Sequence, residues 1–371
     1  MESHLNRMRA CMREEGMACF CCTDLSNVKW LTAFDNVFDD EPAHLAFVSD
    51  DEAVLHTDSR YADAACRAAC GGPWKVDASG GFHARWVADK LSRDGHKAPG
   101  DGLPALAIED SMSLAAFRRF EKSFEEKELP PAIETSDFVL KLRAVKDDVE
   151  IEAMRAAQAI TDAAFEHIVS FMRVGMTERE VQLELEEVMR RLGAEDLAFS
   201  SIVASGANGA APHSIPGEKV LESGDMVVLD FGARKGGYCS DMTRTVCMEY
   251  ATEEAKRVYE AVRNANEAVE RMLRPGVTGA EAHELAECIL EHAGYGGKMG
   301  HGLGHGVGID IHERPNLSPR NTEPLCAGNV VTVEPGVYLG GILGCRLEDF
   351  GVITPDGFEV FTQSTHELVI I

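Results

Sequence analysis

Four acidic residues lie in two glycine-containing hairpin patterns in the second half of the chain. Asp230 and Asp241 belong to LDFGARKGGYCSDMTRT, and Glu334 and Glu348 belong to VVTVEPGVYLGGILGCRLEDFGVI. Both stretches contain β-branched, apolar runs typical of buried strands, where a carboxylate is costly unless a positive partner neutralises it. Four such acids exceed what one arginine can neutralise. The pattern therefore predicts a site for hard divalent cations, which prefer oxygen ligands.

The first hairpin is expected to turn at Lys235-Gly236, the best two-residue loop in RKGG. This turn would set Asp230 directly opposite Asp241, where like charges destabilise a sheet. Arg244 is three residues after Asp241, so its side chain should point to the other face of the strand. A salt bridge to Arg244 is therefore not expected to neutralise Asp241.

The second hairpin is expected to turn around Gly341, which sets Glu334 opposite Glu348. Arg346 is two residues before Glu348 and should share its face, and Thr243 should share the face of Asp241 by the same rule.

Three histidines lie between the hairpins, in HGLGHGVGIDIHE: His301, His305 and His312. The alternating glycines allow the backbone to pass close to another group. The stretch contains neither a GxGxxG or P-loop pattern nor an HExxH zinc motif. Histidines at this density between acidic hairpins predict a functional segment. His213 follows the flexible stretch SGANGAA and is a further candidate.

Two helical patterns precede each hairpin, so the second part of the chain is predicted to contain the same arrangement of elements twice. They cover residues 146–172 and 177–192 before the first hairpin, and residues 252–273 and 279–293 before the second. The first third alternates helices and strands. We expect helices at 3–15, 84–91 and 114–124, strands at 18–22, 45–49, 53–57 and 105–109, and loops at 94–104 and 128–137. The second loop predicts a domain boundary, with domains at 1–138 and 139–371.

Composition excludes several functions. A chain of 371 residues with net charge −26 and pI near 4.9 would be repelled by nucleic acid and by anionic membranes. No apolar run approaches the roughly 18 residues of a membrane span, and the start lacks the apolar core of a signal peptide, so we expect a cytoplasmic protein. The cysteines of GMACFCC are expected in a buried strand rather than at zinc.

The three motifs together resemble the metallopeptidase family with the pita-bread fold, which includes methionine aminopeptidase, Xaa-Pro aminopeptidase and Xaa-Pro dipeptidase (prolidase). They cover the C-terminal two-thirds of the chain. The first third, with NVKWLTAF and TDSRYADAA, resembles the extra domain of the proline-specific members and of creatinase. The resemblance implies an α+β fold, with a pita-bread catalytic domain after a smaller α/β domain, and a homodimer.

The resemblance also implies roles for individual residues. The implied metal ligands are Asp230, Asp241, His305, Glu334 and Glu348, and the implied catalytic groups are Glu334 as proton shuttle, His213, His312, His301 and Arg346, with Tyr338 beside them. Two divalent ions are expected. Four carboxylates with one imidazole favour Mn²⁺ by ligand hardness, and Co²⁺, Fe²⁺ or Zn²⁺ are also compatible.

The sequence therefore predicts a dinuclear-metal Xaa-Pro aminopeptidase acting on peptides with proline in second position. The first alternative is an Xaa-Pro dipeptidase, which has the same chemistry but a pocket closed after proline. The others are a metal-free creatinase-like C–N hydrolase, disfavoured because all five acidic and histidine ligands are retained, and a non-catalytic interaction module on the same fold.

Overall fold

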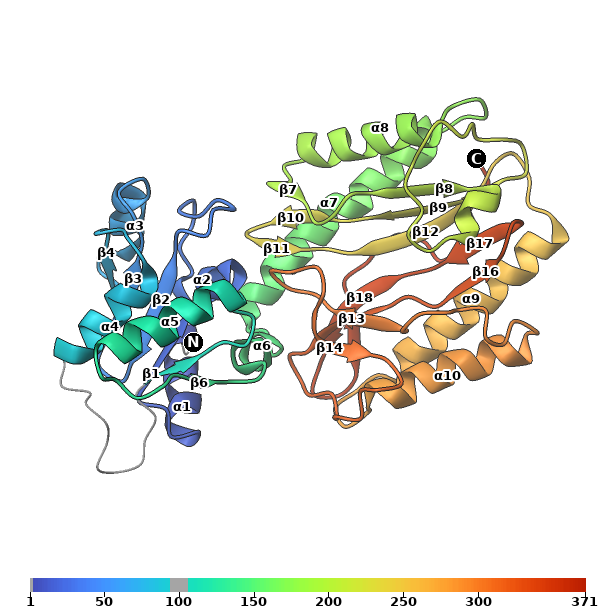
Figure 1. The fold of residues 1–371 in the computed structure, drawn as a ribbon. Helices are drawn as coiled ribbons and strands as arrows, with labels where there is room; N and C mark the ends of the chain where they lie inside the picture. The colour runs from blue at the N-terminus through green and yellow to red at the C-terminus, as the bar shows by residue number, and fades with distance from the viewer. Residues whose placement is uncertain (1–2, 94–105) are drawn as a thin grey trace. The chain divides into compact units, whose positions relative to one another are not determined.

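The computed structural model describes residues 3–93 and 106–371 and divides the chain after Arg143 into two compact units (Figure 1). The expected loop at 94–104 and the first residue of the expected strand at 105–109 lie outside the described residues. The expected domain boundary after residue 138 stays a prediction. The short helix α6 (Phe138–Arg143) contacts α1 and α2 of the first unit.

The first unit is built on a six-stranded sheet in the order β4-β3-β2-β1-β5-β6, in which only β2 runs antiparallel to its neighbours. The strands are β1 (Cys19–Cys22), β2 (Leu45–Ser49), β3 (Ala53–His56), β4 (Trp74–Asp77), β5 (Ala107–Ile108) and β6 (Ile133–Glu134). The remaining helices are α1 (His4–Glu14), α2 (Leu25–Thr32), α3 (Ala62–Ala69), α4 (His83–Arg93) and α5 (Leu114–Glu126). The cysteines of β1 are buried in a strand, as predicted.

The second unit repeats one arrangement, a pair of helices packed on a sheet (Figure 1). Helices α7 (Asp148–Phe171) and α8 (Glu178–Arg191) accompany the sheet β12-β9-β8, and α9 (Glu253–Met272) and α10 (Gly279–His292) accompany the sheet β14-β13-β15-β18-β19. These four helices confirm the expected ones to within a few residues.

The strands of the first sheet are β8 (Ile202–Ser205), β9 (Met226–Phe231) and β12 (Met242–Cys247). A separate small sheet contains β7 (Asp196–Leu197), β10 (Ala233–Lys235) and β11 (Tyr238–Cys239). The 3-10 helix η1 (Gly206–Ala210) follows β8. The second sheet contains β13 (Gly304–Gly306), β14 (Glu313–Leu317), β15 (Val330–Val333), β18 (Asp349–Ile353) and β19 (Phe358–Val360), and β16 (Gly336–Leu339) pairs with β17 (Leu343–Arg346). A bridge between Thr243 and Glu348 joins the two sheets.

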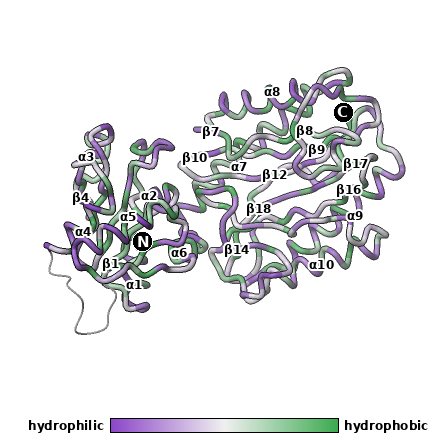
Figure 2. The backbone as a smooth tube through the Cα atoms, in the orientation of Figure 1, coloured by the Kyte–Doolittle hydropathy of each residue, from purple (hydrophilic) through white to green (hydrophobic). Residues whose placement is uncertain are grey.

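Each helix pair covers its sheet with an apolar face. One core packs α7 and α8 against β8, β9 and β12, and another packs α9 and α10 against β15 to β17. Figure 2 shows the helices alternating between hydrophilic and hydrophobic residues, the pattern of helices with one buried side. Among the described residues no helix combines the length and the hydropathy needed to cross a bilayer.

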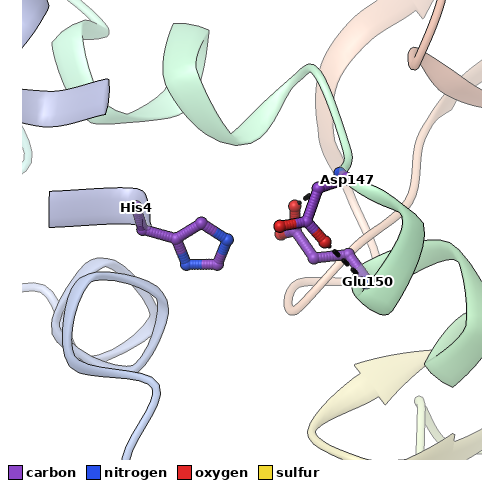
Figure 3. Close-up of side chains that lie close together, drawn as sticks. All are labelled: His4, Asp147 and Glu150. Carbon is purple, nitrogen blue, oxygen red and sulfur yellow. Dashed lines mark hydrogen bonds between the residues drawn. The ribbon is translucent and has the colours of Figure 1, made fainter. Parts of the chain in front are cut away.

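Capping residues set where these helices begin. At the start of α7, the Asp147 side chain accepts a hydrogen bond from the backbone N–H of Val149. It also accepts one from the backbone N–H of Glu150, and the Glu150 side chain accepts one from the backbone N–H of Asp147 (Figure 3). This capping box satisfies donors that lack partners within the helix. Thr177 and Thr278 form equivalent boxes at α8 and α10.

Candidate metal centre

The first hairpin brings Asp230 and Asp241 to neighbouring positions but not directly opposite each other. Asp230 pairs with Thr243, so the expected register is wrong by two residues. The physical reason is the turn, which lies at Gly236-Gly237, with φ of +58° and +77°. A two-residue turn of this kind needs positive φ at both positions, and glycine adopts it without a Cβ clash, so Lys235 remains in β10.

The second hairpin has the expected register. Leu339 pairs with Leu343 around the turn at Gly341, and the same register continues between β15 and β18. Glu334 follows β15 and Glu348 precedes β18, so the two glutamates occupy facing positions where the strands leave the hairpin.

The carboxylates and one imidazole come together where the two sheets meet. Ligand atoms of Asp241, His305 and Glu348 all lie within 4.8 Å of one another. His305 Nε2 is 3.5 Å from Asp241 Oδ2 and 3.3 Å from Glu334 Oε1. Asp230 is held beside this group by an ion pair with Arg346.

Burial makes charged acids costly at this position. It raises the pKa of Glu334 to about 8, with the charge of Asp230 adding to the effect and Arg346 opposing it. It also raises the pKa values of Asp241 and Glu348 well above the usual range, and their neighbouring acids raise them further. The pKa of His305 falls to about 3, first through burial and then through His312, which keeps the imidazole neutral and able to bind a metal.

Two buried oxygens in the group have no partner. Within residues 3–93 and 106–371, Asp230 Oδ1 and Asp241 Oδ1 accept no hydrogen bond. Buried carboxylate oxygens are ordinarily satisfied, and a cation would satisfy both. Four carboxylates and one neutral imidazole thus fit divalent ions that prefer oxygen ligands.

Arg346 organises the acids from one side. Its buried guanidinium pairs with Asp230 and donates to Thr243 Oγ1 at 3.0 Å and to Tyr338 Oη at 2.8 Å. Thr243 Oγ1 in turn donates to Glu348 Oε2 at 2.6 Å. The expectation that Arg346 and Thr243 share the faces of the acids is therefore confirmed.

Close backbone approach holds the imidazole ligand in place. A Cβ on Gly304 would lie 2.1 Å from the carbonyl oxygen of Thr332, which only glycine avoids. The Thr332 hydroxyl accepts a hydrogen bond from His305 N at 3.0 Å and donates to Glu334 Oε1 at 3.2 Å. One threonine therefore sets the spacing of His305 and Glu334.

The other predicted histidines surround this group. His301 Nε2 lies 3.1 Å from Tyr338 Oη, and burial lowers the pKa of His301 to about 4. The ring of His312 is 4.3 Å from that of His305. His213 is exposed on the loop after η1. A pocket of about 720 Å³ opens beside His301 and includes Arg314 in its lining.

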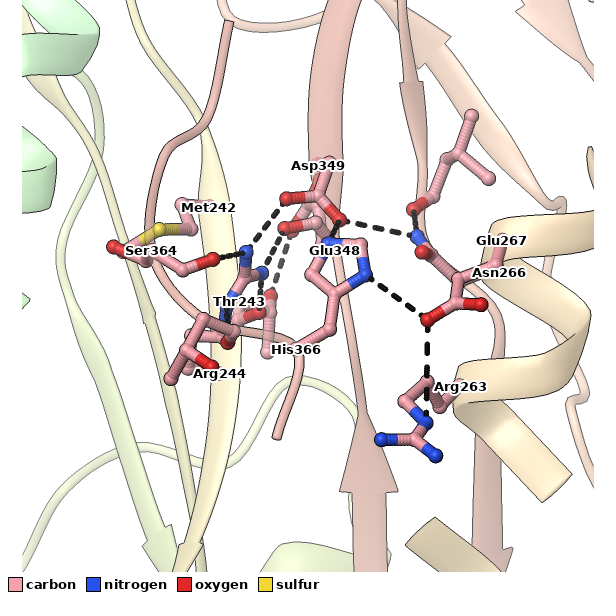
Figure 4. A network of polar contacts seen from close by, with 12 residues as sticks. Met242, Thr243, Arg244, Arg263, Asn266, Glu267, Glu348, Asp349, Ser364 and His366 are labelled. Carbon is pink, nitrogen blue, oxygen red and sulfur yellow. Dashed lines mark hydrogen bonds and ion pairs between the residues drawn. The ribbon is translucent and has the colours of Figure 1, made fainter. Parts of the chain in front are cut away.

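Arg244 and Asp349 form a buried network that the sequence reasoning missed (Figure 4). As expected, Arg244 points away from Asp241. Its five N–H groups donate to the carbonyl oxygens of Thr243, Glu348, Ser364 and Thr365 and to Asp349 Oδ1. Asp349 directly follows the predicted ligand Glu348, so its side chain points to the opposite face of the strand. An acid on that face, where Arg244 also points, was the signal that could have indicated the Arg244–Asp349 pair.

The same network contains a second cluster of possible ligands, Glu270, Asp349 and His366. Arg244 already neutralises Asp349 at 2.6 Å, and His366 Nε2 lies 2.9 Å from the other oxygen of Asp349. Because both oxygens of Asp349 already have cationic or hydrogen-bonding partners, this cluster is better explained as a structural network than as a metal site.

Two regions of the chain match known protein families. Residues 152–355 match metallopeptidase family M24, and residues 4–145 match the creatinase/prolidase N-terminal domain. An Xaa-Pro dipeptidase of Pyrococcus horikoshii is 36% identical over 269 residues, covering 72% of this chain and 76% of its own. Solved structures of an Xaa-Pro dipeptidase from Bacillus anthracis (37% identity, TM-score 0.89) and an X-Pro aminopeptidase from Thermotoga maritima (34%, 0.85) each cover 99% of both chains.

Proposed function

The chain belongs to metallopeptidase family M24, and from that premise we propose that it is a divalent-metal Xaa-Pro dipeptidase, which hydrolyses dipeptides with proline in second position. The observation that carries the proposal is the group of acids around His305, in which Asp230 and Asp241 each retain a buried oxygen with no partner in the described part of the chain. The proposed ligands are Asp230, Asp241, His305, Glu334 and Glu348.

Divalent ions at these ligands would polarise the scissile carbonyl and lower the pKa of a water molecule toward neutrality. The chain's own residues supply the remaining steps. Glu334 is proposed to accept a proton and to return it to the proline nitrogen, which needs that proton because it has no N–H in the substrate. His213 and His312 are proposed to donate hydrogen bonds to the carbonyl oxygen as its negative charge develops.

His301 and Arg346 are proposed to shape the substrate side of the site. The pKa of His301 is lowered to about 4, so its imidazole is neutral at physiological pH and hydrogen-bonds Tyr338 without a net charge. Arg346 is proposed to fix Asp230 through their ion pair.

Dipeptidase and aminopeptidase differ in whether the substrate continues after proline. The sequence alone favoured Xaa-Pro aminopeptidase, whereas the names of the Pyrococcus horikoshii and Bacillus anthracis relatives favour the dipeptidase, which we therefore put first. Two observations keep aminopeptidase as the second candidate. The Thermotoga maritima neighbour is named an X-Pro aminopeptidase, and the 720 Å³ pocket beside His301 offers space for a longer peptide.

The test is hydrolysis of Ala-Pro and of Ala-Pro-Ala by purified protein reconstituted with Mn²⁺. A dipeptidase cleaves Ala-Pro and leaves Ala-Pro-Ala intact. Release of alanine from the tripeptide at a comparable rate would replace our first choice by the second. Hydrolysis that persists after chelation, in protein shown to be metal-free, would instead favour the creatinase-like alternative.

Three finer proposals accompany this function. Mn²⁺ is the proposed metal because the ligands are mainly hard carboxylates. A homodimer is proposed from the resemblance to the family, and a cytoplasmic location is proposed from the sequence. Light scattering on the eluted protein measures the mass of the assembly, and metal analysis after expression without added metal identifies the ions.

A further inference from the structure

The loop that carries His213 joins β8 to a segment that pairs with the start of α8. It covers residues 206–217 and contains only the short helix η1. His213 is exposed, and the neighbouring Ile215 exposes 85% of its surface. A side chain needed at a fixed point near the acids is therefore carried by an exposed part of the loop, and contacts made elsewhere in the loop must hold it in place.

Glu178 is bonded to both ends of this loop. Its carboxylate accepts hydrogen bonds from Ser205 N at 2.7 Å and Ser205 Oγ at 2.8 Å, directly before the loop, and from Asn208 Nδ2 at 3.2 Å, near the start of the loop. At the far end it accepts one from Gly217 N at 3.4 Å. The side chain has no exposed surface, and a buried carboxylate with this many donors is held rigidly.

The backbone at the start of α8 adds to this grip. Arg179 N donates to the Gly217 carbonyl at 3.1 Å, at the end of the loop, and Glu178 N donates to the Lys219 carbonyl at 2.9 Å, two residues after it. These first-turn donors have no partners within the helix. The helix dipole favours a negative charge at this position. Lys219 Nζ, 2.8 Å from Ser205 Oγ, brings a positive charge close to the carboxylate.

Helix α8 does not need Glu178 for its cap. Thr177 and Glu180 already form the capping box, with Glu180 N donating to Thr177 Oγ1 at 3.1 Å and Thr177 N to Glu180 Oε2 at 2.7 Å. The hydrogen bonds that the Glu178 carboxylate accepts come instead from the loop and from Ser205 before it.

The opposite side of the loop rests on the metal centre. Arg346 Nη1 donates to the carbonyl oxygen of Pro212, directly before His213, at 3.4 Å. A Cβ on Gly344 would lie 1.7 Å from the Gly209 carbonyl oxygen, so β17 and η1 touch backbone to backbone. The loop is therefore held between Glu178 on one side and the strand of Arg346 on the other.

We propose that Glu178 is a positioning residue that acts through His213. It fixes the loop 206–217 so that the His213 imidazole meets the carbonyl oxygen of the substrate. The proposal rests on the proposed function for its catalytic part. Its structural part, the tethering of the loop, does not depend on the substrate.

The test is a double-mutant cycle of Glu178→Gln, His213→Ala and the combined variant, assayed on Ala-Pro. Glutamine retains one acceptor but loses the other, so the loop loosens while the fold survives. We expect His213→Ala to lower kcat about 100-fold, as for loss of an oxyanion donor. Glu178→Gln should lower kcat about tenfold with little change in KM. The combined variant should match His213→Ala, because Glu178 has nothing left to position.

Glu180→Ala is the matched control, because it removes a cap from the same helix turn without touching the loop. It should lower the melting temperature and leave kcat unchanged. Hydrogen exchange measured without substrate should rise across residues 206–217 in Glu178→Gln and not in Glu180→Ala. Glu178→Ala, which removes both acceptors, should extend the same effect.

Two results would overturn the inference. One is a combined variant whose loss of kcat equals the product of the single losses, which would mean that Glu178 does not act through His213. The other is unchanged exchange of the loop in both Glu178 variants. If the unmodified protein fails to cleave Ala-Pro, the proposed function fails, and the exchange experiment still decides whether Glu178 tethers the loop.

Discussion

At the scale of single residues, the proposed metal centre is a group of buried acids that the side chains around them do not fully neutralise. Asp230 has Arg346 on one oxygen, and its other oxygen has no partner among the described residues. Asp241 also has a buried oxygen for which residues 3–93 and 106–371 supply no partner, and it lies close to the charges of Glu348 and Asp230. Such an arrangement is unfavourable alone and becomes favourable with a cation, so stability and metal binding are linked here.

Replacing Asp241 by asparagine tests this link. Asp241→Asn keeps the shape of the side chain but removes one charge, so we expect metal affinity to fall at least 100-fold and Ala-Pro hydrolysis to fall with it. Because the substitution also removes repulsion between buried acids, the metal-free variant should be at least as stable as the metal-free parent. Calorimetric metal titration and thermal unfolding measure both effects.

The control for this prediction is Asp196→Asn, which changes an exposed aspartate whose side chain is 64% accessible. It should alter neither quantity. A variant at Asp241 that bound metal as tightly as the parent would contradict the assignment of this ligand.

Strand parity predicted the direction of the side chains, but it did not predict how the strands pair. Parity placed Arg346 with the acids and turned Arg244 away, because side-chain direction alternates in any strand. The register of the first hairpin failed because RKGG offers two adjacent two-residue turns, and the choice depends on positive φ at both Gly236 and Gly237. The hairpin around Gly341 offered a single centre and was predicted correctly.

At the scale of elements, one hydrogen-bonded network links the C-terminal segment to β12 and β18, the strands beside the proposed metal ligands. Arg244, on β12, donates to the Glu348 carbonyl at 2.7 Å and to Asp349 on β18 at 2.6 Å. It also donates to the carbonyl oxygens of Ser364 and Thr365. A guanidinium presents five donors in a fixed plane, so one side chain sets the spacing of three segments.

His366 should make this attachment depend on pH. The hydrogen bond to Asp349 raises the pKa of His366, with burial opposing it. The charges facing it are Asp349, Arg244, Glu267 and Glu270. Because the folded pKa exceeds the unfolded value, the stabilisation is fully present below about pH 6.5. It is lost as the pH rises through the folded pKa.

The variant His366→Gln checks this dependence. Its melting temperature should lie below that of the parent by about 2–4 °C at pH 6, which corresponds to roughly 1 kcal/mol for a partly exposed pair. The difference should shrink at pH 8 and above. A difference that stayed constant from pH 6 to pH 9 would show that protonation of His366 does not contribute.

The length of an element decided whether its pattern could be read. The helices of the second unit complete three or more turns, enough for the 3.6-residue period to appear, and all four were predicted. Helices α2 and α3 have eight residues each, and α6 has six. At that length a helical period cannot be distinguished from the pattern of a loop. The strands β4 and β6 were missed because they too are short, and a short strand shows too few alternations to be recognised.

At the scale of the whole molecule, all the proposed metal ligands lie in the second unit, residues 144–371. The acids come from β9, from the end of β15, and from the positions directly before β12 and β18, so the centre joins the two helix-and-sheet halves of the second unit. The first unit has its own sheet and its own apolar core. Metal binding should therefore stabilise the second unit selectively.

Removal of metal tests this expectation on the full chain. Metal at 100 times its dissociation constant stabilises the folded state by about 2.7 kcal/mol per site, or roughly 5–10 °C for a unit of this size. Addition of Mn²⁺ to chelator-treated protein should raise the unfolding transition of residues 144–371 and slow hydrogen exchange in β9, β12, β15 and β18. The strands β1 to β4 of the first unit should exchange at the same rate with and without metal. Selective protection from hydrogen exchange requires that the first unit open independently of the second. If metal slowed exchange equally in both units, the two units would open together, and the expectation of selective stabilisation would be wrong.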